Sequence, residues 1–255
     1  ETNEENNVIA VPLFVYHPGF GATWDMYREL AAHIAGHGYV VVGLNHGANQ
    51  LVNAEQSLHA MDWIDGADSP VAERVDSGRI AVGGHSMGGK VAFLAASMDN
   101  PESKRIRAVV GWDPVDSAGA PGSAPTEEAP SVAPERMGDV DAAQLIFGAP
   151  AAGCNPVGNN HDSYFESGRA DVPSVHMVFP EGDHMDWVDM NVLGLGSGIG
   201  GLVDLVGGLV CGSGDSEAKP AVLEATRRGT VAWLKMYLQG LEGVSPQVSG
   251  DLMKG

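Results

Sequence analysis

Cysteine is nearly absent from this sequence, with only Cys154 and Cys211 among 255 residues. Two cysteines cannot build a disulfide-dense scaffold. They either pair in an oxidising compartment or remain free thiols. Because no CxxC pair and no cluster of cysteine with histidine is present, the sequence predicts no metal site, and we expect no cofactor.

Basic residues are also few. The chain has 14 lysines and arginines against 33 acidic residues, which gives a formal net charge of -19. A chain this acidic is repelled by phosphate backbones, so we expect no nucleic-acid partner and no electrostatic attraction to anionic lipid. A substrate held in a membrane would have to be reached through apolar loops.

The sequence also lacks an apolar run suited to crossing a membrane. Its most apolar stretch, Val192–Cys211, contains Asp204 and seven glycines. An acidic residue and this many glycines make a poor transmembrane helix.

Short apolar runs alternate with helical patterns along most of the chain. The runs expected to form strands are Val8–Tyr16, Tyr39–Leu44, Ile80–Gly84, Ala108–Trp112, Gln144–Phe147 and Ser174–Phe179. The expected helices are Trp24–Ala35, Ala54–Ile64, Met87–Met98 and Ala221–Leu238. This alternation predicts one α/β domain over residues 1–255, with a mostly parallel central sheet and helices on both faces.

Two segments interrupt the alternation. Residues 114–141 are dense in Pro, Ala, Gly and acidic residues, which predicts a long irregular loop. Residues 192–214 are rich in Gly, Leu and Val, and we interpret them as a candidate lid.

A nucleophile motif stands between an expected strand and an expected helix. Gly84–Gly88 reads Gly-His-Ser-Met-Gly, the G-x-S-x-G pattern, with the apolar run Ile80–Gly83 before it and the helical pattern Val91–Ala96 after it. In a sharp strand-to-helix turn the serine is held exposed in a strained conformation, and glycines permit the close packing. We therefore predict an α/β-hydrolase fold with Ser86 as the nucleophile.

A serine nucleophile needs a histidine base, and nine histidines compete for that role. In this fold the chain order is Ser, then Asp or Glu, then His. The histidines that precede or adjoin the serine fail this order: His17, His33, His37, His46, His59 and His85. His176 lies inside an apolar run, so we interpret it as a core residue. His161 lies in a polar stretch and is either a surface residue or a substrate contact. His184 shortly follows the strand Ser174–Phe179, so we predict it as the base.

The acid is expected at a strand end. Asp113 directly follows the run Ala108–Trp112 and precedes Pro114. A carboxylate in this place can orient the imidazole and stabilise its charged form. Asp116 is the alternative, and Asp139 and Asp141 lie further along the chain.

Ester hydrolysis also needs two backbone N–H donors for the developing oxyanion. Met87, directly after the nucleophile, is one predicted donor. The other is expected in the loop that reads His-Pro-Gly-Phe-Gly after the first parallel strand, where Phe20 is the first choice and Gly21 the second.

Three of these motifs resemble the chlorophyllases. Gly84–Lys90 is similar to their Gly-His-Ser-x-Gly-Gly-Lys elbow, Gly111–Asp116 to their Asp-Pro-Val turn, and Gly182–Asp186 to their Gly-His-Met-Asp segment. The resemblance extends from about Val8 to Leu241 and implies the triad Ser86, Asp113 and His184. It also implies hydrolysis of the phytyl ester of chlorophyll, in a chloroplast or another intracellular membrane-associated compartment.

Two departures from that family leave alternatives open. Met87 stands where many plant members have Arg, and Pro18 interrupts the usual His-Gly of the oxyanion loop. Both features also resemble cutinases and polyester hydrolases, so a broad carboxylesterase is the second hypothesis. A ligand receptor without turnover is the third, although an intact triad argues against it.

An apolar ester needs an apolar groove. The segment Val192–Val210, including Leu202 and Leu205, is expected to line that groove and to contact a membrane or pigment–protein surface transiently. The alternative is a helix and turn that cap the core. Trp187, Gly21 and His161 are further predicted substrate contacts: Trp187 at the apolar rim, Gly21 beside the oxyanion donor and His161 from its loop. Since this fold usually opens with a short antiparallel pair, we also expect edge strands upstream of Glu1.

Overall fold

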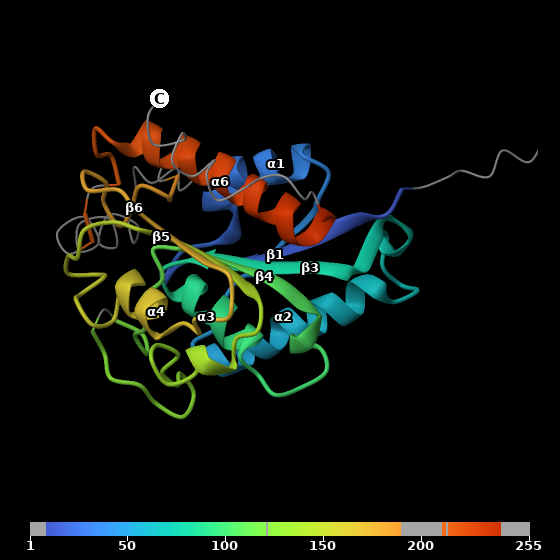
Figure 1. The fold of residues 1–255 in the computed structure, drawn as a ribbon, viewed down its shortest axis with the longest axis horizontal. Coiled ribbons are helices and arrows are strands. Elements are labelled where there is room, and N and C mark those ends of the chain that lie inside the picture. Colours follow the sequence, from blue (N-terminus) through green and yellow to red (C-terminus); the bar gives the residue numbers. More distant parts are fainter. Residues whose placement is uncertain (1–8, 121, 190–210, 213, 241–255) are drawn as a thin grey trace, which may run out of the picture.

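A parallel six-stranded sheet forms the centre of the computed structural model, which describes residues 9–120, 122–189, 211–212 and 214–240 (Figure 1). The strand order is β2-β1-β3-β4-β5-β6, and each neighbouring pair is parallel. The strands are β1 (Val11–His17), β2 (Val40–Gly43), β3 (Val75–His85), β4 (Ile106–Trp112), β5 (Ala143–Gly148) and β6 (Ser174–Val178).

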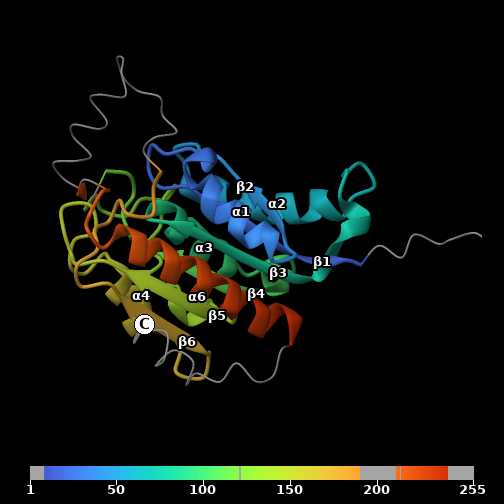
Figure 2. The ribbon, with the colours of Figure 1, turned by 90° about the horizontal axis from the view of Figure 1, so that it is seen from above.

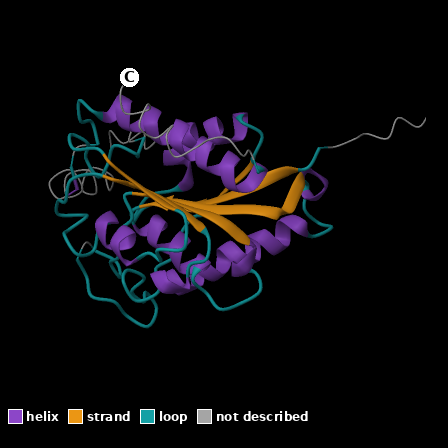
Figure 3. Cartoon of the chain, in the orientation of Figure 1, coloured by secondary structure: helices purple, strands orange, loops and turns teal. Residues whose placement is uncertain are grey.

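Helices cover both faces of this sheet (Figure 3). Helices α1 and α6 lie on one face, while α2, α3 and α4 lie on the other (Figures 1 and 2). Their bounds are α1 (Arg28–Gly36), α2 (Gln50–Asp65), α3 (Met87–Ala96), α4 (His161–Ser167) and α6 (Lys219–Gln239), with short 3-10 helices η1 (Trp24–Tyr27), η2 (Ala72–Arg74), η3 (Ser103–Arg105) and η4 (Met137–Asp139). The predicted α/β-hydrolase architecture is confirmed.

The strands supply alternate residues to two apolar layers. Along β1, Leu13 and Val15 pack on the side of α2 and α3, whereas Phe14 and Tyr16 pack on the side of α1 and α6. This alternation follows from the two-residue repeat of a strand. Full burial of one such side chain contributes about 1.5–3 kcal/mol, so both layers stabilise the sheet.

The structure differs from the sequence expectation at several element boundaries. Helix α2 begins at Gln50 rather than Ala54, because the Asn49 side chain accepts the Val52 N–H at 3.0 Å and caps it. Helix α4 was not predicted, since its seven residues are too few to show a helical period. The described residues of segment 114–141 contain η4 and no strand.

The strand order reverses its direction between β1 and β3. The connection from β1 to β2 runs toward one edge of the sheet, and the connection from β3 to β4 runs toward the opposite edge. In open parallel sheets such a reversal leaves room for a ligand outside the strand ends. The predicted oxyanion loop follows β1 and the G-x-S-x-G motif lies at the end of β3, so both lie at the carboxyl ends of these two neighbouring strands.

Most of the candidate lid, residues 192–214, lies outside the described residues, and so do Leu202 and Leu205. Its role in substrate binding stays a prediction. Among the helices that the structure describes, none has the length and apolar character needed to cross a membrane.

Candidate active site

Ser86 occupies a strained turn between β3 and α3. Its backbone has φ 55° and ψ −123°, a conformation that non-glycine residues rarely adopt. Gly84 and Gly88 permit this turn: a Cβ on Gly88 would lie 2.2 Å from the His17 carbonyl oxygen, and one on Gly84 would lie 2.5 Å from the Gly88 backbone. Side chains at these two positions would separate the strand from the helix, so the glycines are required.

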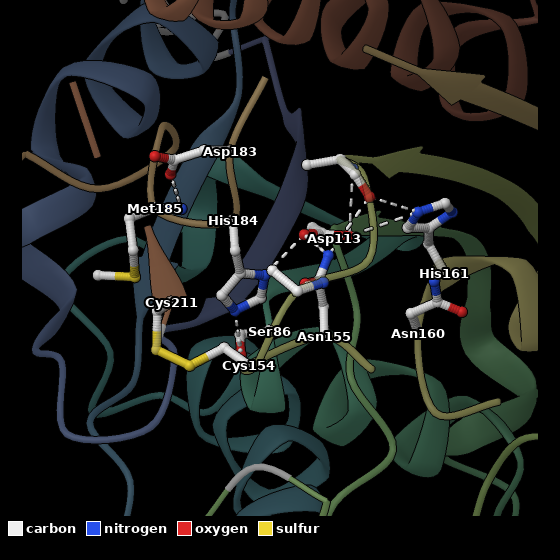
Figure 4. A network of polar contacts seen from close by, with 12 residues as sticks. Ser86, Asp113, Cys154, Asn155, Asn160, His161, Asp183, His184, Met185 and Cys211 are labelled. Carbon is white, nitrogen blue, oxygen red and sulfur yellow. Dashed lines mark hydrogen bonds and ion pairs between the residues drawn. A yellow bond between two sulfur atoms is a disulfide. The ribbon is translucent and has the colours of Figure 1, made fainter. Parts of the chain in front are cut away.

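The structure brings Ser86, His184 and Asp113 into one hydrogen-bonded chain (Figure 4). The Ser86 Oγ lies 2.9 Å from His184 Nε2, and His184 Nδ1 lies 2.6 Å from Asp113 Oδ2. In this order a histidine can accept the serine proton while the carboxylate stabilises the charged ring. The three residues come from the ends of β3 and β4 and the loop after β6.

The carboxylate of Asp113 is fully buried and held by further donors. Its Oδ1 accepts the Ala149 N–H at 3.3 Å, and its Oδ2 accepts the side-chain amide of Asn155 at 2.9 Å. Sequence reasoning missed Asn155, whose only local signal is its place after Cys154. Cys154 forms a disulfide with Cys211, with 4.7 Å between the Cα atoms, which resolves the open question of whether the two cysteines pair.

The loop that carries His184 is attached to the start of α6. Asp186 is fully buried and accepts hydrogen bonds from the Asp183 N–H at 2.9 Å and the Ser216 hydroxyl at 2.6 Å. Asp183 in turn accepts the N–H groups of Met185 and Gly214. These bonds hold the backbone on both sides of His184.

Asp116, the alternative predicted acid, does not contact His184. Its carboxylate forms a buried ion pair with Lys90 of α3, at 3.0 Å, and accepts N–H groups from Val132 and Ala133. Burial lowers the pKa of Lys90, and the charge of Asp116 partly opposes that shift. Asp141, a more distant candidate, forms surface ion pairs with Lys104 and Arg169.

The predicted oxyanion loop packs directly on the elbow. A Cβ placed on Gly19 would lie 3.4 Å from the Ser86 Cβ, so the backbone before Phe20 is beside Ser86. Met87 begins α3, where helix N–H groups point outward and favour negative charge. The positions of Phe20 and Met87 therefore suit the predicted donation of two N–H groups to an oxyanion.

Comparison with known proteins gives the family. The family model described as Chlorophyllase matches residues 5–249. The chain belongs to the chlorophyllase family. It is 26% identical to Chlorophyllase-2 of Arabidopsis thaliana over 192 residues and 25% identical to Chlorophyllase-1 of the same plant over 252 residues.

A second group of relatives matches a shorter stretch of this chlorophyllase-family chain. Cutinase 2 of Thermobifida cellulosilytica is 36% identical over 99 residues, which cover 37% of each protein. The match to Chlorophyllase-2 covers 67% of this chain and 58% of that protein, and the match to Chlorophyllase-1 covers 90% and 72%. The chain thus spans well under two thirds of the length of several curated relatives that it matches.

The structure buries two predicted substrate contacts of the chlorophyllase-family chain. Trp187 is only 2% exposed, because its large ring packs in the core and its indole N–H donates to the Thr226 hydroxyl at 2.9 Å. His161 is buried at the start of α4, and its Nε2 donates to the Ala149 carbonyl at 2.8 Å. Both side chains therefore lie beneath the surface of the protein. Gly21 is exposed with φ +71° and stays a predicted contact.

One side-chain group among the described residues has the composition of a metal site: His161, Asp162 and His176. The His161 Nδ1 and His176 Nε2 atoms are 2.7 Å apart. Two nitrogens bound to tetrahedral zinc lie roughly 3.3 Å apart, given zinc–nitrogen distances of about 2.0–2.1 Å. The ring nitrogens are therefore spaced for a direct hydrogen bond, and we assign no metal to this group.

Two buried histidines and a half-buried one predict that the protein loses stability in mild acid. Burial holds the pKa of His17 and His85 well below the usual value and lowers that of His46 to about 4. As the pH falls below about 6.5, these histidines become protonated in the unfolded chain but stay neutral in the folded chain. The free energy of unfolding therefore decreases. Below about pH 6.5, each histidine lowers the free energy of unfolding by up to about 1.4 kcal/mol per pH unit. Above that pH its contribution to stability is fully present.

Urea unfolding at pH 7.5, 6.5 and 5.5 measures this slope. Carboxylates ordinarily titrate near pH 4, so this window isolates the histidines. His46→Asn should make the slope shallower, whereas the matched surface change His59→Asn should leave it unchanged. A free energy of unfolding that stays constant over this range would contradict the prediction.

Proposed function

We propose that this chain is a serine carboxylic ester hydrolase that cleaves the phytyl ester of chlorophyll to chlorophyllide and phytol. The observation that carries the hydrolase assignment is the hydrogen-bonded chain from Ser86 through His184 to Asp113. Membership of the chlorophyllase family supports the choice of substrate.

The reaction follows from the geometry. The Ser86 oxygen attacks the ester carbonyl while His184 Nε2 takes its proton across 2.9 Å. The N–H groups of Met87 and Phe20 stabilise the resulting oxyanion. The tetrahedral species collapses, His184 returns the proton to the departing phytyl oxygen, and an acyl-enzyme remains. Water, deprotonated by His184, then releases chlorophyllide as the carboxylic acid and restores Ser86.

Exposed aromatic side chains beside the oxyanion loop support an apolar substrate. Phe20 is 62% exposed and Trp24 is 41% exposed. Each CH₂ group removed from water contributes about 0.8 kcal/mol, so such a surface can retain a long alkyl chain. We propose that residues 192–210 extend this surface and contact the membrane or micelle that holds chlorophyll.

A second candidate is a cutinase-like hydrolase of polyesters and simple esters. The 36% identity to Cutinase 2 over 99 residues favours it. The two candidates share the same chemistry and differ in the groove that receives the alcohol or acid chain.

Incubation with chlorophyll a in mild detergent, followed by chromatography, tests the proposal. We expect multiple turnovers to chlorophyllide, and p-nitrophenyl butyrate serves as the matched soluble ester. Cleavage of the soluble ester alone would favour the cutinase-like candidate. Stoichiometric pigment binding without product from either ester would favour a ligand receptor and overturn the hydrolase assignment.

A further inference from the structure

A buried histidine directly precedes the nucleophile, and both of its ring nitrogens are hydrogen-bonded. His85 is 2% exposed; its Nε2 lies 2.8 Å from the carbonyl oxygen of His184, and its Nδ1 lies 2.8 Å from the Tyr27 hydroxyl. A carbonyl oxygen only accepts, so Nε2 carries the proton. In a neutral ring Nδ1 then accepts, and Tyr27 donates to it.

The Tyr27 hydroxyl also accepts a hydrogen bond, from the backbone N–H of Gly19 at 3.1 Å. The direction of every bond is thereby determined: Gly19 donates to Tyr27, Tyr27 donates to His85, and His85 donates to the backbone of His184. Burial, with a smaller contribution from His184, lowers the pKa of His85, and burial raises that of Tyr27. Both side chains stay neutral, which preserves this single arrangement of protons.

We call this chain of hydrogen bonds, from Gly19 through Tyr27 and His85 to His184, the relay. Its two ends lie at different parts of the proposed active site. Gly19 directly precedes Phe20, the proposed oxyanion donor, while His184 is the proposed base. The relay passes next to Ser86, since a Cβ on Gly19 would lie 3.0 Å from His85 Nδ1 and 3.4 Å from Ser86 Cβ. Loop 17–21 and the loop after β6 are far apart in sequence, and this chain of hydrogen bonds joins them.

We propose that Tyr27 and His85 are positioning residues that set the oxyanion loop and the base at the correct separation around Ser86. The inference rests on the proposed ester hydrolase activity and assigns a role to two buried residues. Small displacements of catalytic groups have large effects on rate, about 100-fold for 1 Å, so loss of the relay lowers turnover.

Tyr27→Phe removes only the hydroxyl. We expect kcat for p-nitrophenyl butyrate to fall about tenfold with KM within about twofold, because the groups that shift act in the transition state. Tyr16→Phe is the matched control: Tyr16 is also buried, its ring centroid lies 6.3 Å from that of Tyr27, and its hydroxyl donates to the Trp24 carbonyl instead. Equal losses of kcat in the two variants would overturn the proposal.

Replacement of His85 tests the other half of the relay. His85→Gln keeps an N–H donor for the His184 carbonyl and should retain more kcat than His85→Leu. If both residues act through one relay, Tyr27→Phe added to His85→Leu lowers kcat by no more than about twofold further. Losses of kcat that multiply in the double variant would contradict a shared relay. If His85→Leu fails to fold, the Tyr27→Phe variant still tests the proposal.

A spectroscopic measurement separates this inference from the proposed function. If the wild-type protein cleaves no ester, the proposed function fails, but the imidazole ¹⁵N spectrum still tests the relay. We expect His85, assigned by its loss in His85→Gln, to be neutral with the proton on Nε2 at pH 7, and its Nδ1 signal to shift in Tyr27→Phe but not in Tyr16→Phe. A proton on Nδ1, or no shift in Tyr27→Phe, would overturn the relay.

Discussion

Ser86→Ala is expected to lower the turnover of chlorophyll a and of p-nitrophenyl butyrate by about 10⁴–10⁶-fold. The variant lacks the oxygen that we propose as the nucleophile and that lies 2.9 Å from His184 Nε2. The remaining oxyanion donors give only a small residual rate. Initial rates measured by chromatography and by release of p-nitrophenol give this ratio directly.

The fold of the Ser86→Ala variant should persist, because alanine is no larger and the φ of 55° is already tolerated at this position. Circular dichroism and the unfolding midpoint check this. Ser97→Ala is the matched control: Ser97 caps the other end of α3, and its hydroxyl donates to the Leu94 carbonyl at 2.9 Å. Its turnover should remain within about twofold of wild type. A Ser86→Ala protein with a tenth of the wild-type rate would mean that Ser86 is not the nucleophile.

Lys90→Met is expected to destabilise the fold by about 3–5 kcal/mol. Lys90 and Asp116 have side-chain exposures of 0% and 4%, and removal of the cation leaves a buried carboxylate without its counter-charge. Lys90 Nζ also donates to the Ser117 carbonyl at 3.2 Å, so the pair attaches the loop after β4 to α3. Urea unfolding at pH 7.5 gives the free energy.

Two further variants separate the buried charge from ordinary packing. Lys90→Met combined with Asp116→Asn should be more stable than Lys90→Met alone, since neither charge is then left unpaired. Lys104→Met breaks the surface pair with Asp141, where Lys104 is 48% exposed, and should change the free energy by less than about 1 kcal/mol. Equal losses for Lys90→Met and Lys104→Met would show that burial of the pair has no energetic consequence.

Local patterns predicted the main elements of the fold. The apolar runs predicted the six strands of the described residues, because each run is short, rich in branched residues and bounded by turn residues. The start of β3 at Val75 was missed, since Asp76, Ser77 and Gly78 interrupt the apolar pattern there. Boundaries such as the start of α2 depend on a capping side chain rather than on periodicity.

The sequence also contained the order of the triad but not its surroundings. Ser86, Asp113 and His184 could be chosen because each follows a strand that ends at the same edge of the sheet. Asn155 and the Tyr27–His85 relay gave no such signal, since their partners are set by loop packing. Trp187 is expected at the apolar rim, and only the packing of α6 shows that its ring faces the core.

By itself, the amino-acid sequence determined the parallel sheet, the strained turn at Ser86 and the family resemblance, because these depend on neighbouring residues in fixed patterns. The tertiary structure alone showed what each of Asp113 and Asp116 contacts, although the two stand three positions apart after the same strand. Asp113 turns back, with φ 46°, toward His184, whereas Asp116 meets Lys90 inside the protein. A contact between residues distant along the chain depends on how irregular loops pack, and no local pattern encodes that.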